Sequence, residues 1–258
     1  MTGSTERGAA LVTGAARRIG RTIALELARE GCDVAVHYGT SREEADAVVD
    51  EIHALGVQAI AVQGDLADPE APLRLVLEAE RGLGRPLTVL VNNASRFEPD
   101  TLQTMTLADW TAHMDINLRA PVFLAQAFAA QKPRGIEGNI INIIDQRVLK
   151  LNPLFFSYTL SKTGLWTATR TMAQALAEEN IRVNAVSPGP CLANARMSEE
   201  DFARQCELTL LGRGTTPEEI AAAVRFILSA PAMTGQMIVL DGGQHLNWQT
   251  PDITEVRE

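Results

Sequence analysis

The sequence predicts one α/β domain over 1–258, built on a Rossmann-type doubly wound parallel sheet of about seven strands. The chain has 258 residues and is 46% hydrophobic, which suits one large domain with a substantial core. Its strand-like runs are apolar almost throughout, as strands covered by helices on both faces require. Longer amphipathic stretches separate these runs, and such alternation favours parallel βαβ units.

The expected strands are distributed along the whole chain. They are AALVT (9–13), DVAVHY (33–38), AIAVQG (59–64), TVLVN (88–92), NIINIID (139–145), IRVNAV (181–186) and QMIVLD (236–241). Helix ends are also marked. Gly31 and Gly56 are placed to end helices, whereas Asp68-Pro69 and Thr216-Pro217 are placed to begin them.

Two segments depart from this alternation. Residues 1–8 are expected to form a flexible N-terminal tail. Residues 187–215 show no regular pattern and follow the sixth strand, near the carboxyl ends where open α/β sheets bind ligands. We interpret this second segment as a substrate lid, with a disordered surface loop as the alternative.

Charge and composition exclude several function classes. Lys and Arg number 23 against 32 Asp and Glu, giving a net charge of -9, so neither nucleic acid nor a membrane is an expected partner. No signal-like start and no apolar stretch of about 18 residues is present, which predicts a cytoplasmic protein. The three cysteines and four histidines lack ligand spacing, so no metal site is expected.

The first predicted strand runs into TGAARRIG (13–20), a turn suited to binding a phosphate. Gly14 and Gly20 allow the backbone to approach a pyrophosphate, and the helix that follows offers unpaired N–H groups. An ordinary strand-to-helix turn is the alternative.

The second predicted strand ends without the acidic residue that binds the ribose 2′-hydroxyl in many NAD-binding folds. His37, Ser41, Arg42 and the nearby Arg17 offer donors and positive charge to a 2′-phosphate instead. The expected cofactor is therefore NADPH rather than NADH. The alternative is that Arg42 only begins a solvated helix.

Several motifs occur in the order typical of short-chain dehydrogenase/reductases, and the sequence resembles that family over nearly its whole length. They are TGAARRIG, GDL (64–66), NNAS (92–95), Asn117, the pair Tyr158 and Lys162, SPG (187–189) and DGG (241–243). The resemblance implies a set of cofactor-binding residues: Gly14, Arg17, Arg18, Ile19, Gly20, His37, Ser41, Asp65, Leu66, Asn93, Ala94, Ser95, Tyr158, Lys162, Pro188 and Gly189. It implies that Asp65 and Leu66 contact the adenine.

Tyr158 and Lys162 lie four residues apart and therefore share one face of a helix. There the ammonium group is expected to lower the pKa of the phenol, which makes Tyr158 a usable proton donor. A buried tyrosine beside a surface lysine is the alternative. The family resemblance implies that Asn117 supports a proton relay.

The fifth predicted strand ends on Asp145, where most of the family has a serine that donates a hydrogen bond to a substrate carbonyl. An ionised carboxylate only accepts hydrogen bonds. Asp145 is therefore either kept protonated by apolar surroundings or serves a different reaction, and we expect a substrate that offers nitrogen.

Within the family, the sequence resembles the pteridine and dihydromonapterin reductases in Arg18, Phe97 and Asp145. The resemblance implies that Phe97 and the nicotinamide sandwich a flat pterin, and that Ser95 and Arg18 bind its polar edge. It further implies that Asp145 and Tyr158 deliver a proton to a ring nitrogen while NADPH provides the hydride. Thr40 departs from the pattern, because a basic residue is expected there.

Two other functions remain open: a carbonyl reductase for sugars, 3-oxoacyl groups or xenobiotic ketones, and an NADP(H)-binding sensor without catalysis. The family resemblance also implies a homotetramer formed through two long helices, expected over 106–131 and 156–179. The apolar faces of those helices suit an intramolecular core equally well.

Overall fold

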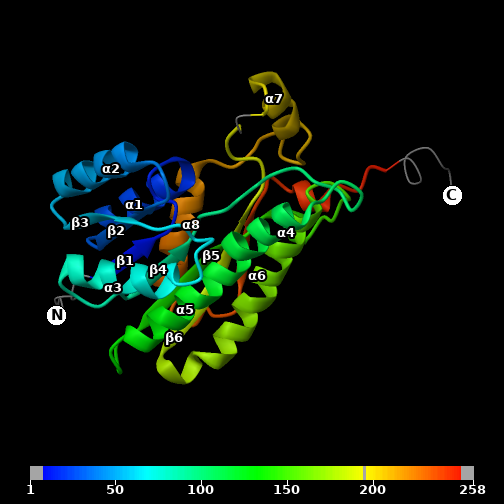
Figure 1. The fold of residues 1–258 in the computed structure, drawn as a ribbon. Coiled ribbons are helices and arrows are strands. Elements are labelled where there is room, and N and C mark those ends of the chain that lie inside the picture. Colours follow the sequence, from blue (N-terminus) through cyan, green and yellow to red (C-terminus); the bar gives the residue numbers. More distant parts are fainter. Residues whose placement is uncertain (1–7, 194–195, 251–258) are drawn as a thin grey trace.

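The computed structural model describes residues 8–193 and 196–250, which form one α/β domain (Figure 1). Its sheet has seven parallel strands in the order β3-β2-β1-β4-β5-β6-β7, which confirms the predicted fold class. The strands are β1 (Ala9–Val12), β2 (Asp33–Tyr38), β3 (Ala59–Gln63), β4 (Val89–Asn92), β5 (Gly138–Ile143), β6 (Ile181–Pro188) and β7 (Met237–Leu240).

Helices cover both faces of this sheet (Figure 1). They are α1 (Arg18–Arg29), α2 (Arg42–Ala54), α3 (Ala71–Leu83), α4 (Leu107–Met114), α5 (Ala120–Gln131), α6 (Phe156–Ala175), α7 (Glu199–Glu207) and α8 (Pro217–Ser229). One buried cluster joins α1, α2 and α8 to the sheet, and a second joins α3, α5 and α6. Successive β1 residues alternate between the clusters, with Leu11 in one and Val12 in the other, because strand side chains alternate between faces.

The strand order reverses at β1, which pairs with β2 on one side and β4 on the other. Connections leaving these two neighbours run to opposite faces, so a crevice opens at the carboxyl ends of the strands. The turn after β1, the loop after β4 and the segment after β5 all start at this edge. The fold therefore gathers three motif-bearing segments in one place.

Most of the predicted boundaries agree with the structure. Gly31 and Gly56 have φ of 89° and 84° just beyond α1 and α2, and Thr216 forms a capping box at the start of α8. The predicted start at Asp68-Pro69 is wrong, because α3 begins at Ala71. The Asp68 carboxylate instead accepts a backbone N–H in the turn before the helix.

Two predicted segments lie partly outside the described residues. The predicted N-terminal tail falls outside the described residues except for Gly8, whose carbonyl accepts a hydrogen bond from the Asp33 N–H at 3.0 Å. In the predicted lid, β6 continues to Pro188 and α7 spans Glu199–Glu207, so the segment is not irregular throughout. Its residues 194–195 lie outside the description.

Helix α7 has clear local causes. Ser198 accepts the Asp201 N–H, and three acidic residues occupy the first turn, where they complement the positive end of the helix dipole. Among residues 8–193 and 196–250, no helix is both long and apolar enough to cross a bilayer.

Candidate active site

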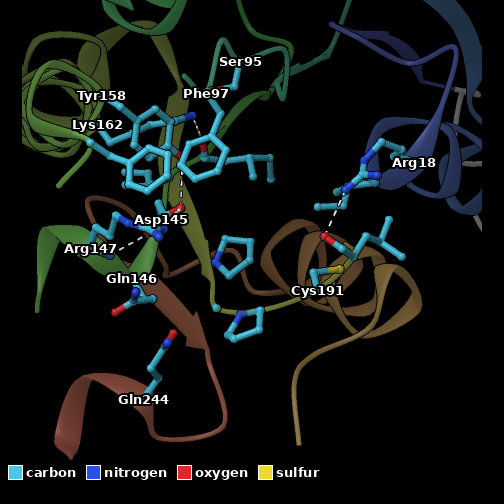
Figure 2. Close-up of a pocket in the computed structure, with 18 of the residues that line it drawn as sticks. Arg18, Ser95, Phe97, Asp145, Gln146, Arg147, Tyr158, Lys162, Cys191 and Gln244 are labelled. Carbon is cyan, nitrogen blue, oxygen red and sulfur yellow. Dashed lines mark hydrogen bonds and ion pairs between the residues drawn. The ribbon is translucent and has the colours of Figure 1, made fainter. Parts of the chain in front are cut away.

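Two adjoining cavities open at the carboxyl ends of the strands. The first, of about 390 Å³, lies over the turn after β1 and the end of β2. The second, of about 400 Å³, lies over the ends of β5 and β6 beneath α7 (Figure 2). They share Arg18, Ile19, Asn93 and Ser95 as lining residues and therefore form one continuous groove.

The turn after β1 brings two backbone segments unusually close. Gly14 has a φ of +63°, and a Cβ added at Gly20 would lie 2.2 Å from the Gly14 carbonyl oxygen. Glycine is therefore required at Gly20 for steric reasons. Helix α1 begins here with no side-chain cap and no acidic residue in its first turn. Its first N–H groups are thus open to an anion, which fits the pyrophosphate of a dinucleotide.

His37 supports this turn from beneath, and its predicted role as a cofactor contact is wrong. The Gly14 N–H donates to Nδ1 at 3.0 Å, and Nε2 lies 3.0 Å from the Gly64 carbonyl oxygen. Both ring nitrogens are therefore occupied in a side chain that is 2% exposed. Burial lowers the pKa of His37 to about 4, so the ring is neutral and offers no charge to a phosphate.

The rest of the cofactor side agrees only in part with the predicted set. Ser41 and Arg17 line the first cavity, together with Gly39 and Thr40, and no acidic side chain is among the lining residues of that cavity. Arg17 lies 3.6 Å from Glu44 and its side chain is 63% exposed, so it can reach a 2′-phosphate at the groove edge.

The predicted adenine contacts do not line the groove. Leu66 is 5% exposed and belongs to a core cluster, so its side chain is not available to adenine. The exposed Asp65 carboxylate accepts the Ala67 N–H at 2.9 Å, which closes a local turn.

The remaining predicted cofactor residues come together as expected. Ala94 and Asn93 line the phosphate side, while Pro188 and Gly189 line the deeper cavity beside Tyr158 and Lys162. The Asn93 side chain donates to the carbonyl oxygens of Thr13 and Gly14, at 2.9 and 3.2 Å, and so ties the loop after β4 to the phosphate turn.

Three side chains form the chemical centre of the deeper cavity (Figure 2). The Tyr158 hydroxyl donates to Asp145 Oδ2 at 2.9 Å, and Asp145 Oδ1 accepts the Arg147 backbone N–H at 2.8 Å. Lys162 Nζ donates to the Ile143 carbonyl oxygen at 2.8 Å. Strand β5 ends at Ile143, two residues earlier than predicted, so Asp145 lies beyond the strand and caps the next turn.

These contacts favour one of the two alternatives for Asp145. Its oxygens accept hydrogen bonds from Tyr158 and the Arg147 N–H, and the Arg147 guanidinium lies 3.4 Å from each oxygen. The two Arg147 groups can only donate, and the Tyr158 hydroxyl is placed to donate as well. Donors stabilise a carboxylate, so the geometry supports an ionised acceptor rather than a protonated acid.

The predicted lowering of the Tyr158 pKa is wrong in this structure. Burial, followed by the neighbouring Asp145 charge, raises the pKa of Tyr158 well above its usual value. Burial lowers the pKa of Lys162 to about 8. The Lys162 ammonium is held at the Ile143 carbonyl, 5.8 Å from the Tyr158 ring centre. Tyr158 is therefore a neutral phenol whose proton points at Asp145.

Asn117 lies behind the cavity in a π-helical turn (Asp115–Arg119) between α4 and α5. Its Oδ1 accepts the Arg96 N–H at 2.8 Å and the Ser95 hydroxyl at 3.2 Å. Its Nδ2 donates to the Arg96 carbonyl at 2.9 Å and to Ser161 Oγ at 3.0 Å. These contacts hold the loop after β4 against α6, and a role in a proton relay stays a prediction.

Aromatic side chains form one wall of the cavity. Phe97 stacks on Phe155 with ring centres 4.4 Å apart and meets the Tyr158 ring edge-on at 4.7 Å. Phe155 has a φ of 55°, a left-handed conformation that is strained for a bulky residue. The Arg147 guanidinium lies 5.2 and 5.0 Å from the two ring centres. Phe97 thus has an aromatic partner that the sequence did not indicate.

Arginines connect the groove to the predicted lid. Arg18 Nη1 and Nη2 donate to the carbonyl oxygens of Ala193 and Leu192, at 2.8 and 3.2 Å. Arg18 adopts a φ of 57°, a left-handed conformation that glycine adopts more easily. Arg196 pairs with Glu98 at 2.5 Å and donates to the Phe97 carbonyl at 2.6 Å.

Several lining residues were missed by the sequence reasoning. They are Gln146, Arg147, Phe155, Leu192, Met197, Phe202, Gln205 and Gln244. None belongs to a motif, because they come from the turn after β5, the approach to α6, the predicted lid and the segment after β7. The apolar LFF run (154–156) just before Tyr158 was the one available signal.

Comparison with known proteins finds relatives that match most of the chain. The family model described as enoyl-(acyl carrier protein) reductase matches residues 14–245. The 3-oxoacyl-[acyl-carrier-protein] reductase FabG of Staphylococcus aureus is 38% identical over 241 residues, which cover 92% of this chain and 98% of the relative.

Two solved structures are more similar in sequence. They are FolM alternative dihydrofolate reductase 1 of Brucella canis, complexed with NADP, and the same enzyme of Brucella suis, in complex with NADP. Each is 46% identical and covers 96% of this chain and 98% of the other, with TM-scores of 0.90 and 0.92.

Proposed function

The chain belongs to the short-chain dehydrogenase/reductase family, and from this premise we propose that it is an NADPH-dependent reductase of a pterin-like C=N heterocycle. The observation that carries the proposal is the hydrogen bond from Tyr158 to the Asp145 carboxylate, 2.9 Å long. It places a proton donor and an acceptor side by side in the deeper cavity.

NADPH is the cofactor that fits the groove. The open N–H groups of α1 suit the pyrophosphate, and the end of β2 presents Gly39, Thr40 and Ser41 with no acidic residue to repel a 2′-phosphate. The Brucella structures contain NADP. When bound, the cofactor supplies a hydride, and the chain supplies the proton and the orientation.

The hydrogen-bonding capacity of each cavity residue determines whether it orients the substrate or supplies the proton. The Asp145 carboxylate accepts an N–H from the heterocycle, which fixes how the ring lies. The Tyr158 hydroxyl, beside that carboxylate, donates its proton to the ring nitrogen of the reduced C=N bond. Lys162, with a pKa of about 8, keeps positive charge near the phenolate that remains.

The aromatic wall suits a flat substrate. Phe97 lies at the cavity with Ser95 and Arg18 beside it, so a conjugated ring can stack while its polar edge meets donors. Phe155 supports Phe97 from one side and holds its plane fixed. We propose that the lid segment, attached through Arg18 and Arg196, covers the substrate.

A second function has support from the FabG-type relatives, which are named as 3-oxoacyl reductases. In that case Tyr158 alone would donate a hydrogen bond to a ketone oxygen. The Asp145 carboxylate argues against it, because two oxygens that only accept hydrogen bonds would face the carbonyl oxygen. Retained Tyr158 and Lys162 likewise argue against a non-catalytic sensor.

The experiment that tests the proposal is NADPH oxidation against a panel of 7,8-dihydrobiopterin, dihydrofolate, biopterin, aldehydes, ketones and a 3-oxoacyl thioester, with NADH in parallel. We expect turnover of the reduced pterins with NADPH. Turnover of the carbonyl substrates alone would refute the pterin proposal and leave the second function standing.

We further propose a cytoplasmic homotetramer. The surface between α5 and α6 has a shallow apolar groove lined by small residues such as Ala125 and Ala129, together with Met172. Phe123 on α5 and Leu160 on α6 are 48% and 40% exposed, which favours cover by another subunit. Sedimentation at micromolar concentration tests this assembly, and a monomer would contradict it.

A further inference from the structure

The deeper cavity contains two amide side chains that the proposed chemistry does not use. Gln146 follows Asp145 in a short helical turn (Gln146–Val148), and Gln244 opens another such turn (Gln244–Leu246) after β7. Both line the cavity, and Figure 2 shows them on its Asp145 side with their amide ends directed toward one another. The two turns lie in contact.

Each amide has an unsatisfied oxygen. Oε1 of Gln146 and Oε1 of Gln244 are buried and have no hydrogen-bond partner among the described residues, and the same holds for Arg147 Nε. The Gln146 residue as a whole is only 5% exposed. Since buried polar atoms are nearly always paired, three unpaired atoms on residues that line one cavity point to a ligand that completes them.

Backbone hydrogen bonds fix the two turns that carry these amides. The Gln146 carbonyl accepts the N–H groups of Leu149 and Lys150, at 2.9 and 3.1 Å. The Gln244 N–H donates to the Asp241 carbonyl at 3.0 Å, and Lys150 Nζ donates to the Gln244 carbonyl at 3.2 Å. The side chains therefore project from two fixed turns that Lys150 links, and such a preorganised arrangement is typical of a binding subsite.

We propose that Gln146 and Gln244 form a specificity subsite that binds a hydroxyl-bearing substituent on the heterocycle. This inference rests on the proposed reduction of a pterin-like ring. The two amide oxygens require O–H or N–H donors, and Arg147 Nε requires an acceptor. Vicinal hydroxyl groups provide both, whereas an alkyl chain would leave all three atoms unpaired.

The test compares two substrates that differ only in their substituent. 7,8-Dihydrobiopterin carries a dihydroxypropyl group, and 6-methyl-7,8-dihydropterin carries a methyl group. Gln146→Met and Gln244→Met keep the side-chain length but remove the amide. We expect each variant to lower kcat/KM for dihydrobiopterin about three- to tenfold, the loss typical of one hydrogen bond, and to change the methyl analogue less than about twofold.

Gln58→Met is the matched control, because Gln58 is exposed beside the amino end of β3, away from the cavity. NADPH binding, followed by fluorescence, verifies that each variant is folded. If Gln146→Met fails to fold, the half-buried Gln244→Met carries the test alone.

Each result has a distinct meaning. Equal losses on both substrates, or no loss on either, would overturn the subsite and leave pterin reduction intact. No turnover of either pterin by the unmodified enzyme would instead refute the proposed function on which the subsite rests.

Discussion

The two ends of the groove are built from different materials. At the phosphate end, the groups placed to bind the pyrophosphate belong mostly to the backbone. They are the open N–H groups of α1 and the glycines of the turn, which His37 supports from beneath. At the substrate end, side chains from separate segments converge, among them Asp145 after β5 and Tyr158 on α6. One end depends on conformation and the other on residue identity.

Because of this difference, the phosphate end indicates the cofactor, whereas the substrate end indicates the reaction. A backbone site for a pyrophosphate can be shared by enzymes with unrelated substrates, because a phosphate needs only N–H groups and space. A side-chain site changes its chemistry with one substitution. A carboxylate such as Asp145 in place of a serine removes a hydrogen-bond donor, and we propose that this change turns the substrate end away from carbonyl substrates.

The substitution with the largest expected effect impairs the substrate end alone. Tyr158→Phe removes the proton donor but keeps the ring that meets Phe97 edge-on. We expect pterin turnover to fall by about 10² to 10⁴, the range for losing a general acid, while the NADPH Kd changes little. Single-turnover NADPH oxidation and fluorescence titration measure the two quantities. Undiminished turnover would remove Tyr158 from the mechanism.

The substitution with the next largest expected effect impairs the phosphate end alone. In Gly20→Ala the new Cβ would lie 2.2 Å from the Gly14 oxygen and 2.5 Å from Asn93 Nδ2, so the backbone must move apart. We expect this displacement to raise the NADPH Kd on the order of a hundredfold. Calorimetric titration with NADPH measures it, and unchanged affinity would show that the turn does not bind the cofactor.

A smaller effect concerns Arg18, which belongs to both ends. Arg18→Gly relieves a left-handed φ of 57°, a gain of about 1 kcal/mol, but removes the hydrogen bonds to Leu192 and Ala193. We expect a free energy of unfolding within about 1 kcal/mol of the original, and a kcat/KM for pterin that is lower by about tenfold or more, since a hydrogen bond from a charged group is lost. Urea denaturation and steady-state kinetics measure the two effects. Full activity would exclude Arg18 from substrate binding.

The smallest effect is a pH dependence at the phosphate end. The pKa of His37 is about 4 in the folded protein, below its ordinary 6.5, so the unfolded state binds more protons between these values. The stability from His37 is therefore complete above pH 6.5 and is lost as pH falls toward 4. We expect His37→Asn to flatten stability over that window, as thermal unfolding from pH 4 to 7 would show. An unchanged slope would contradict the neutral buried ring.

The sequence was sufficient for the sheet and for the phosphate turn, because both depend on local patterns. Continuous apolar runs located all seven strands, and Gly14 and Gly20 marked a turn that tolerates no other residue at Gly20. His37 was misjudged for a physical reason. Its position near the end of β2 suggested a donor for the cofactor, whereas the last residues of the strand are buried.

The substrate end could be predicted only where a motif marked it. Tyr158 and Asp145 were found by spacing and by departure from the family pattern, and the structure joins them by a hydrogen bond. Phe155, Gln146 and Gln244 were not found. Their roles arise from a left-handed backbone and from contacts between distant segments, which no local pattern of residues encodes.

The central claim is that the Asp145 carboxylate selects a nitrogen substrate. Its most direct test is the ratio of kcat/KM for 7,8-dihydrobiopterin to that for a small ketone, measured in the unmodified enzyme and in Asp145→Ser. Serine restores a donor, so we predict that the ratio falls at least tenfold, with pterin reduction lost and ketone reduction retained or raised. An equal loss on both substrates would contradict the claim, because Asp145 would then be needed for activity without discriminating between the two substrates.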